Sequence, residues 1–343
     1  MQRFNPYING LRGFAALLVF IFHLYDMPRK HGLWPSSSDF SSQLMASLSF
    51  GVDIFFVISG YLITASLIRH NNIKAFLIDR CIRIYPLFLS LHVIIFAVAP
   101  IIGYKWFAGI SLESWLINFV SNLLFLPGIF NLPLAQLNAW SLSYEALFYI
   151  IAALFYSFRG KKFAIILLAL TILPIFYFHP RALFLAVGVA IYFLHQNQLI
   201  ITKRLAIFPD ILSLIILALA LSHAQENILF YGIAIIFAAL LFNSIAYGYG
   251  IFAAILKHPA MQFMGNISYS FYLLHAFVMF AAMGVCKKIL IHYFPILPVY
   301  MAFALLSTAV TIAVSYISYL LLEKKASALI RRHFVARKPA VSG

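Results

Sequence analysis

The chain has 343 residues, of which 64% are hydrophobic and only 10% are charged. Soluble domains carry about 25% charged residues, so this composition excludes an ordinary soluble globule, and its hydrophobicity excludes a disordered chain. The formal net charge of +15 would suggest nucleic-acid binding in a soluble protein. Basic residues also mark the cytoplasmic loops of membrane proteins. We therefore expect an all-α, multi-pass membrane protein with no nucleic-acid partner.

Apolar runs predict about ten membrane-spanning helices, since one helix needs about 20 apolar residues to cross a bilayer. The expected spans, in chain order, are 11–27, 44–67, 84–103, 139–158, 163–179, 181–195, 207–223, 228–247, 264–286 and 297–322. Between the third and fourth spans, residues 104–138 are too interrupted for a span and indicate an interfacial or re-entrant segment. Residues 1–323 are thus expected to form a single transmembrane domain.

Positive charges predict the orientation of this domain. With both termini in the cytoplasm, about three quarters of the 24 Lys and Arg residues fall on the cytoplasmic side, as the positive-inside rule requires. The short loop 159–162 carries three of these charges and would be difficult to place outside. Residues 324–343 are basic and are predicted to form a cytoplasmic tail on the anionic leaflet.

Arg12 and His23 are the first ionisable pair inside a predicted span. Such residues are costly in a membrane, so each is a hypothesis of function. The two residues are eleven positions apart, close to three helical turns, and therefore share one face about 16 Å apart. Arg12 is expected near the cytoplasmic end and His23 near the opposite end. The alternative is two unrelated helix-end residues that cap or snorkel.

Two carboxylates follow in later spans. Asp53 is expected near the outer end of the second span, at a depth similar to that of His23. It is either catalytic or part of a buried salt bridge or backbone hydrogen bond. Glu145 lies about two turns inside the fourth span and shares a face with Ser141. Because an unpaired carboxylate is costly there, we expect Glu145 to be protonated or paired with His23 or an arginine.

Arg80 and Arg83 precede the third predicted span and share one helical face at its cytoplasmic mouth. Two guanidinium groups there suit a phosphate, although positive-inside anchoring explains them equally well. In the ninth span, Ser268, Tyr272 and His275 form a polar stripe. This stripe either lines a cavity or joins helices through hydrogen bonds.

Other chemical signatures are absent from the sequence. The histidines are scattered without ligand spacing, and there are two cysteines, so we expect no metal site and no disulfide framework. His92 is predicted to be a buried histidine with its hydrogen bonds satisfied. Neither G-x-S-x-G, a Walker loop nor H-E-x-x-H occurs.

Five sequence blocks occur in a specific order. They are Asn9-Gly10-Leu11-Arg12 with His23, Gly51-Val52-Asp53 through Ile63, Arg80-Cys81-Ile82-Arg83-Ile84-Tyr85-Pro86, Trp140-Ser141-Leu142-Ser143-Tyr144-Glu145, and Ile267-Ser268 through His275. Together they resemble the membrane-bound acyltransferase 3 family from about residue 5 to Glu323. One element departs, because the acidic-x-Pro motif after the last span reads Glu323-Lys324-Lys325.

The resemblance implies an enzyme of the bacterial cytoplasmic (inner) membrane. It would move an acyl group, usually acetyl, from cytoplasmic acyl-CoA to a hydroxyl of an envelope glycan such as O-antigen or exopolysaccharide. The partners would then be acyl-CoA, the glycan acceptor and the lipid bilayer, with no permanently bound cofactor. The resemblance also implies catalytic roles for His23, Arg12 and Glu145, and a position near the CoA phosphates for Arg80, Arg83 and the adjacent Tyr85.

Acyl transfer to an alcohol needs a base, which suits His23. Asp53 or Glu145 could orient its imidazole. Contacts to the substrate or the oxyanion would come from Trp140, Ser141, Tyr144, Ser268 and His275. His23 could instead carry a transient acyl group. Two other interpretations are a transporter or flippase and an inactive scaffold of the same architecture; the chain lacks the internal repeat common in carriers.

Overall fold

The computed structural model describes residues 5–35, 40–224 and 227–335, and these ranges form helices without any strand. Seven described helices are long and apolar enough to cross a membrane. They are α1 (Pro6–Lys30), α3 (Gly51–His70), α4 (Ile73–Ile102), α7 (Trp140–Ser157), α12 (Ile228–Tyr247), α14 (Pro259–Lys288) and α15 (Ile296–Ser318). Three shorter apolar helices are α8 (Lys162–Phe178), α9 (Leu183–Gln196) and α11 (Asp210–His223). Each predicted span has a helix at its position, and the all-α fold class is confirmed. Only seven of the ten expected spans are long enough to cross by length, because α8, α9 and α11 have 17, 14 and 14 residues.

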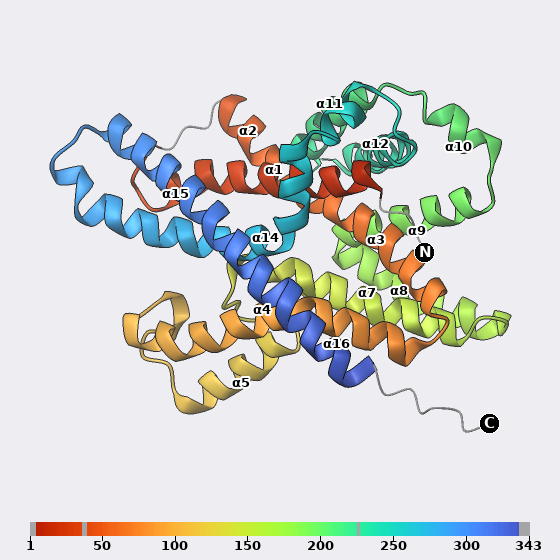
Figure 1. Ribbon diagram of the computed structural model, residues 1–343, viewed down its shortest axis with the longest axis horizontal. Coiled ribbons are helices and arrows are strands. Elements are labelled where there is room, and N and C mark those ends of the chain that lie inside the picture. Colours follow the sequence, from red (N-terminus) through yellow and green to blue (C-terminus); the bar gives the residue numbers. More distant parts are fainter. Residues whose placement is uncertain (1–4, 36–39, 225–226, 336–343) are drawn as a thin grey trace.

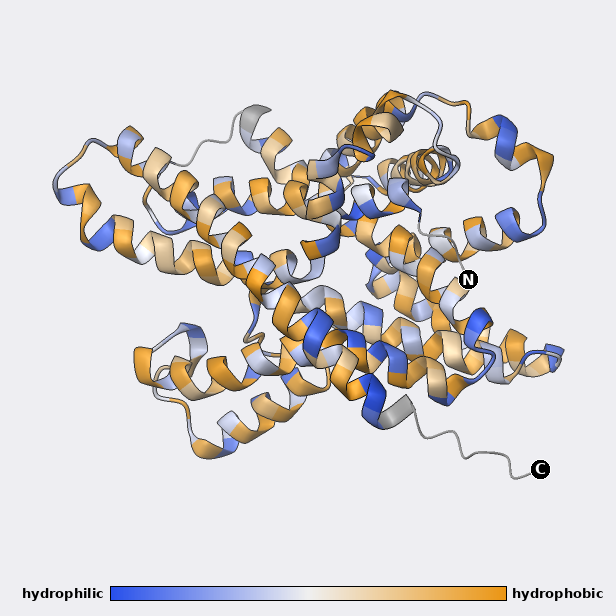
Figure 2. Ribbon diagram, in the orientation of Figure 1, coloured by the Kyte–Doolittle hydropathy of each residue, from blue (hydrophilic) through white to orange (hydrophobic). Residues whose placement is uncertain are grey.

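Turns at the two ends of these helices face opposite sides of the molecule. Figure 1 shows turns 71–72, 158–161 and 197–199 toward one side, here called the terminal side because both marked ends of the chain lie toward it. Turns 103–111 and 289–295 lie toward the other side. Figure 2 shows hydrophobic residues along most helices, whereas hydrophilic residues concentrate at turns and on α16 (Ser327–Val335). This pattern suits helices that cross a bilayer side by side.

Glycines allow two pairs of these helices to pack closely. A Cβ at Gly13 of α1 would lie 2.6 Å from the backbone nitrogen of Gly265 in α14. A Cβ at Gly60 of α3 would lie 2.0 Å from the carbonyl oxygen of Leu185 in α9. Small residues permit such close backbone approach in membranes, where van der Waals packing rather than hydrophobic burial joins helices. Gly60 therefore lets α9 approach α3 closely.

The segment between α4 and α7 enters the molecule and turns back. Its main helix, α5 (Leu112–Leu123), has 12 residues and is about 18 Å long, too short to cross a core of about 30 Å. The Trp115 indole donates to the Phe96 carbonyl near the end of α4, while the Tyr85 hydroxyl donates to the Leu123 carbonyl farther back along α4. The chain then returns through α6 (Pro127–Phe130) to Leu134, whose carbonyl accepts from the Trp106 indole. These contacts hold the segment alongside α4, as expected for an interfacial or re-entrant segment.

Helix α4 begins at Ile73, well before the predicted start of the third span at residue 84. Asn72 caps it by accepting a hydrogen bond from the Ala75 backbone at 2.9 Å, and Asn71 ends α3 in the left-handed conformation. This Asn-Asn turn separates two apolar runs that would otherwise merge. As a result, Arg80 and Arg83 lie inside α4 rather than before it.

The first part of the predicted tail packs against α4. A π-helical turn, Tyr319–Ala326, leads from α15 into α16. The Ser327 hydroxyl donates to the Ile82 carbonyl at 3.0 Å, and Arg331 lies 2.6 Å from the Asp79 carboxylate. Residues 336–343, with their predicted contact to the leaflet, lie outside the described residues, as does the basic residue Arg3. The remaining short helices are α2 (Phe40–Ser47), α10 (Ile200–Leu205) and α13 (Ile251–Leu256).

Candidate active site

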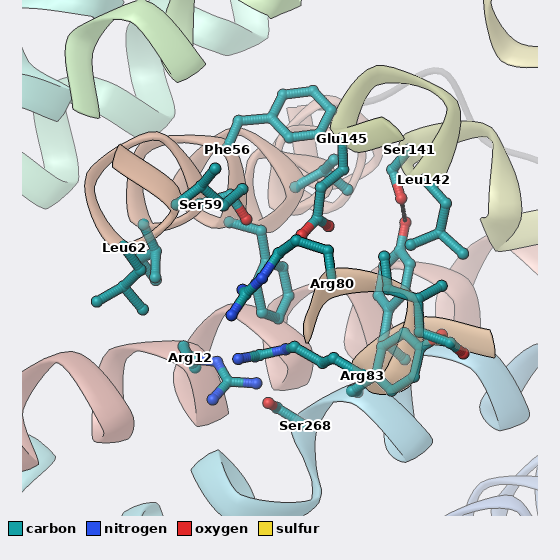
Figure 3. Close-up of a pocket in the computed structure, with 17 residues that line it drawn as sticks. Arg12, Phe56, Ser59, Leu62, Arg80, Arg83, Ser141, Leu142, Glu145 and Ser268 are labelled. Atoms are coloured by element: carbon teal, nitrogen blue, oxygen red, sulfur yellow. Dashed lines mark hydrogen bonds between the residues drawn. The ribbon is translucent and has the colours of Figure 1, made fainter. Parts of the chain in front are cut away.

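Five helices enclose a cavity whose lining is rich in arginine. Side chains from α1, α3, α4, α7 and α14 surround it, and its empty volume, counted out to the open mouth, is about 760 Å³. Figure 3 shows the guanidinium groups of Arg12, Arg80 and Arg83 directed into one common space, with Glu145 and Ser268 at its edge. We call this space the arginine cavity. Three positive groups against one carboxylate make it a site for an anion.

Arg80 is held firmly at the wall of the arginine cavity. Its side chain lies beside the Asp79 carboxylate at 2.5 Å and donates to the Ser66 hydroxyl at 3.4 Å. Arg80 is only 8% exposed, yet its buried Nε has no hydrogen-bond partner. An unmatched buried donor costs about 1–3 kcal/mol, which a bound anion could offset. Arg83, three residues later on the same face, is exposed at the mouth.

Glu145 lies with the arginines rather than with His23. The hydroxyl of Tyr149, one turn later in α7, donates to its carboxylate. Glu145 lines the same cavity as Arg12, Arg80 and Arg83. His23 or an arginine was expected beside this carboxylate, and the structure places the arginines there. The same helical face carries Ser141, as predicted from their spacing, and Ser141 also lines the cavity.

Phe55 and Tyr272 form the inner floor of the arginine cavity. Their ring centroids are 5.7 Å apart, and the Tyr272 hydroxyl shares a hydrogen bond of 2.9 Å with Ser141. Tyr272 also borders the next layer, since its ring centroid is 6.0 Å from that of His275. The floor thus separates the cavity from a second polar group deeper in the molecule.

That second group consists of His23, His275 and Asn138, and we call it the histidine cluster. The Nδ1 of His23 is 3.1 Å from the Nε2 of His275, and the Nδ2 of Asn138 is 3.3 Å from the same Nε2. His275 is fully buried, and Asn138 is 3% exposed. His23 does not line the arginine cavity, but it lies behind the Tyr272 floor through its contact with His275.

Asp53 is buried on a different side of the floor. Its carboxylate is 1% exposed, and Arg181 is its charged partner, with Nε 3.6 Å from Oδ1. Arg181 also lies over the Trp140 ring at 5.4 Å. The neighbouring Tyr144 hydroxyl hydrogen-bonds the His179 ring at 2.8 Å. Of the two roles expected for Asp53, the structure places it in a buried salt bridge, and Trp140 and Tyr144 lie beside that pair.

Three further predicted residues have clear positions. Ser268 is fully buried and lines the arginine cavity next to Arg12 (Figure 3). The Tyr85 hydroxyl instead holds the re-entrant helix α5 and does not line the cavity. His92 is buried as predicted. Its ring packs against Phe96 and Phe119.

Sequence reasoning missed several residues that shape the site. Asp79 orients Arg80, yet it stands directly before that arginine, and this adjacency is a usable signal. Asn138 lies just before the predicted fourth span and was treated as part of the loop. Glu323 was left without a role, but its carboxylate accepts hydrogen bonds from the Ser270 backbone and hydroxyl of α14. It lies in the π-helical turn, a feature often found at functional sites.

Within residues 5–35, 40–224 and 227–335, no group of three or more His, Cys, Asp or Glu side chains lies close enough to hold a metal ion. The chemistry available to the described residues is therefore that of arginines in an open cavity and of a neutral histidine cluster behind it.

Comparison with known proteins adds an independent observation. A family model described as an acyltransferase domain matches residues 5–320. The peptidoglycan O-acetyltransferase OatA of Listeria monocytogenes is 30% identical over 165 residues, which cover 44% of this chain and 24% of that protein. An uncharacterized protein of Haemophilus influenzae is 31% identical over 246 residues, covering 62% of this chain and 98% of that protein.

A putative O-acetyltransferase of Staphylococcus aureus is 32% identical over 100 residues, covering 27% of this chain and 14% of that protein. The match thus spans about a quarter of the Listeria protein and a smaller part of the Staphylococcus protein. No solved structure matches the chain.

Proposed function

Because the chain belongs to the acyltransferase 3 family, we propose that it is a membrane O-acyltransferase that uses acyl-CoA as donor. The acyl group is most simply acetyl, since two of the similar proteins above are named O-acetyltransferases. The acceptor is a hydroxyl of a cell-envelope glycan, and the membrane is the bacterial cytoplasmic membrane, with the terminal side in the cytoplasm.

The observation that carries this proposal is the arginine cavity. Arg12, Arg80 and Arg83 meet there from two helices far apart in sequence, and among the described residues one carboxylate, that of Glu145, lines the same space. Guanidinium groups bind phosphate through paired, charge-assisted hydrogen bonds. The phosphates of CoA would stay at these arginines, because anions cross lipid poorly, while the pantetheine arm extends toward the floor. Arg80 supports this role with its buried, unpartnered Nε.

His23 is the base in this proposal. The carbonyl oxygen of Val19 lies 3.0 Å from its Nδ1 and can only accept, so the proton resides on Nδ1. Nε2 then carries the lone pair and has no protein partner in the described part of the chain. The acceptor oxygen bonds to the thioester carbonyl carbon, its proton moves to His23 Nε2, and the C–S bond breaks. CoA leaves as a thiolate, which is a good leaving group because thiols have pKa values near 8.5.

The acyl end of the donor has to reach His23 past the Phe55 and Tyr272 rings. Arg12 and His23 are separated by about 16 Å along α1, a distance that an extended pantetheine arm can cover. Ser141 and the Tyr272 hydroxyl lie on this path and are the nearest hydroxyl donors for the oxyanion. Trp140 and Tyr144 lie farther along, beside Arg181, where an acceptor sugar would approach.

The proposal is tested with purified protein in detergent and acetyl-CoA labelled in the acetyl group. Binding should be measured directly and transfer followed with glycan acceptors of known structure. We expect saturable binding that weakens when Arg80 or Arg83 is changed to Gln and stays unchanged in the matched control Arg204→Gln, an exposed arginine on the terminal side. Failure of the wild-type protein to bind acetyl-CoA would contradict the donor assignment and favour a transporter.

A further inference from the structure

We infer that His275, held by Asn138, is a positioning residue that fixes the tautomer and the ring orientation of His23. This inference rests on the proposed role of His23, but its geometry is independent of the identity of donor and acceptor. It replaces the expectation that Asp53 or Glu145 orients the imidazole, since those carboxylates lie beside Arg181 and Tyr149.

The hydrogen bonds of His275 define its protonation. Its Nδ1 lies 3.0 Å from the Phe271 carbonyl oxygen, which can only accept, so Nδ1 carries the proton. Its Nε2 is then a bare lone pair in the neutral ring. The opposite tautomer would set a lone pair against the carbonyl oxygen in a fully buried site, which is unfavourable.

Two donors converge on the bare Nε2 of His275. One is the Nδ1–H of His23 at 3.1 Å, which is shared with the Val19 carbonyl. The other is the Asn138 amide at 3.3 Å. The amide orientation of Asn138 is fixed independently, because its Nδ2 also donates to the Tyr272 carbonyl at 2.8 Å. Both nitrogens of His275 and the Nδ1 of His23 therefore meet complementary partners, while the Nε2 of His23 is left for the substrate.

This arrangement indicates that His275 positions His23 and does not relay its proton. If the Nδ1 proton of His23 moved to His275, the new Nε2–H would face the Asn138 amide hydrogen, and two donors would oppose each other. Asn138 thus keeps His275 neutral and accepting. When His23 takes the acceptor's proton on Nε2, its Nδ1–H becomes a charge-assisted donor to His275 and the bond strengthens.

A neutral acceptor is physically suited to this depth. In serine hydrolase triads a carboxylate orients the histidine, but a carboxylate inside a bilayer costs several kcal/mol unless it is paired. An imidazole offers the same lone pair without charge. Packing holds its ring in place, since Phe20 and Phe271 lie with centroids 5.9 Å and 6.2 Å from that of His275.

The test compares His275→Leu, which removes the acceptor at similar size, with His275→Gln, whose side-chain oxygen can accept near the Nε2 position. The control is His92→Leu, which changes another fully buried histidine in an apolar helix; its ring packs against Phe88 and Phe119, outside the cluster. For each variant, acetyl-CoA affinity, kcat and the amount of folded protein are measured. Solid-state ¹⁵N NMR of labelled histidine, with the His23 signals assigned from a His23→Gln sample, reports which ring nitrogen carries the proton.

We expect His275→Leu to lower kcat by about 10- to 100-fold, as loss of an orienting partner does, with acetyl-CoA affinity unchanged. His275→Gln should restore part of that loss, and His92→Leu should leave kcat at the wild-type level. The ¹⁵N signals of His23 should show Nδ1–H alone in wild type and a tautomer mixture in His275→Leu. Asn138→Ala, which leaves both histidines in place, should give a smaller fall and serves if His275→Leu does not fold.

Wild-type kcat in His275→Leu, or unchanged His23 tautomer in that variant, would overturn the inference. A different result separates it from the proposed function. If the tautomer of His23 changes as expected but His23→Gln retains full transfer activity, His275 positions His23 and the assignment of His23 as base is wrong.

Discussion

The arginine cavity and the histidine cluster lie on either side of the Phe55–Tyr272 floor and differ in charge and in exposure to solvent. The cavity is open and charged, with Arg83 exposed at its mouth and one carboxylate among three guanidinium groups. The histidine cluster has no formal charge, and each hydrogen bond joins a neutral donor to a neutral acceptor. A charged side chain has a low free-energy cost where water solvates it and a high cost inside a bilayer. Binding is therefore assigned to the charged region and proton transfer to the neutral one.

The difference predicts that the two regions can be damaged separately. A change in the cavity should weaken donor binding and leave the chemical step intact, whereas a change in the cluster should do the reverse. Uniform loss of binding affects KM, while loss of a group that acts in the transition state affects kcat.

The largest effect is expected at His23. Changing it to Gln keeps its size and one hydrogen-bonding group but removes the basic nitrogen, so kcat should fall by about 10²- to 10⁴-fold. Acetyl-CoA affinity, measured by direct binding, should stay within the wild-type range. Substantial transfer by folded His23→Gln protein would mean that another residue is the base. The division of donor binding and proton transfer between the two regions would then be wrong.

Arg80 and Arg83 should produce the opposite pattern with an intermediate effect. Losing one charge-assisted phosphate contact costs about 1.5–3 kcal/mol, so Arg→Gln at either position should weaken acetyl-CoA binding by about 10- to 150-fold. The single-turnover rate at saturating donor should change much less. Arg→Lys should recover only part of the affinity, because the planar fork is lost. Equal binding by Arg80→Gln and wild type would mean that these arginines only anchor the topology.

The smallest effect is expected where α16 contacts Asp79, outside the lining of the cavity. Arg331 pairs with Asp79, which in turn holds Arg80, but the Arg331 side chain is 51% exposed. Such a pair contributes about 0–1 kcal/mol, so Arg331→Gln should change the acetyl-CoA Kd by no more than about fivefold. The adjacent exposed Arg332→Gln is the control and should leave Kd unchanged. A large loss in Arg331→Gln alone would show that α16 belongs to the binding site itself.

Much of the helical architecture was predictable because a contiguous apolar run predicts a helix without information from distant residues. The apolar helices and the interruption between α4 and α7 followed from the apolar runs, and four residues predicted from the sequence, Arg12, Arg80, Arg83 and Glu145, line one cavity. Their arrangement around one cavity was not predictable, because it depends on how helices distant in sequence pack together. The sequence allowed either His23 or an arginine as the partner of Glu145. The packing of α7 against α4 places the carboxylate with the arginines.

Asn138 and Arg181 illustrate a second limit. Both lie at the edges of predicted spans, where a polar residue is ordinary and gives no signal. Asn138 becomes informative only once α14 brings His275 and the Tyr272 carbonyl within hydrogen-bond distance. Arg181 follows a predicted span as an ordinary flanking charge would, yet it is the partner of the buried Asp53.

The central claim is that acyl-CoA occupies the arginine cavity from the terminal side. Ser59 lines this cavity between α3 and the arginines (Figure 3), so Ser59→Cys, in a protein whose two native cysteines are changed to Ala, places one thiol there. Ser157→Cys, exposed at the end of α7, is the matched control. A membrane-impermeant thiol reagent is added to oriented vesicles with and without acetyl-CoA.

The thiol at position 59 should react only with reagent added on the terminal side, and acetyl-CoA should slow that reaction. The thiol at position 157 should react at the same rate with and without acetyl-CoA. Labelling at position 59 that acetyl-CoA does not slow, at concentrations where binding is measured, would contradict the central claim.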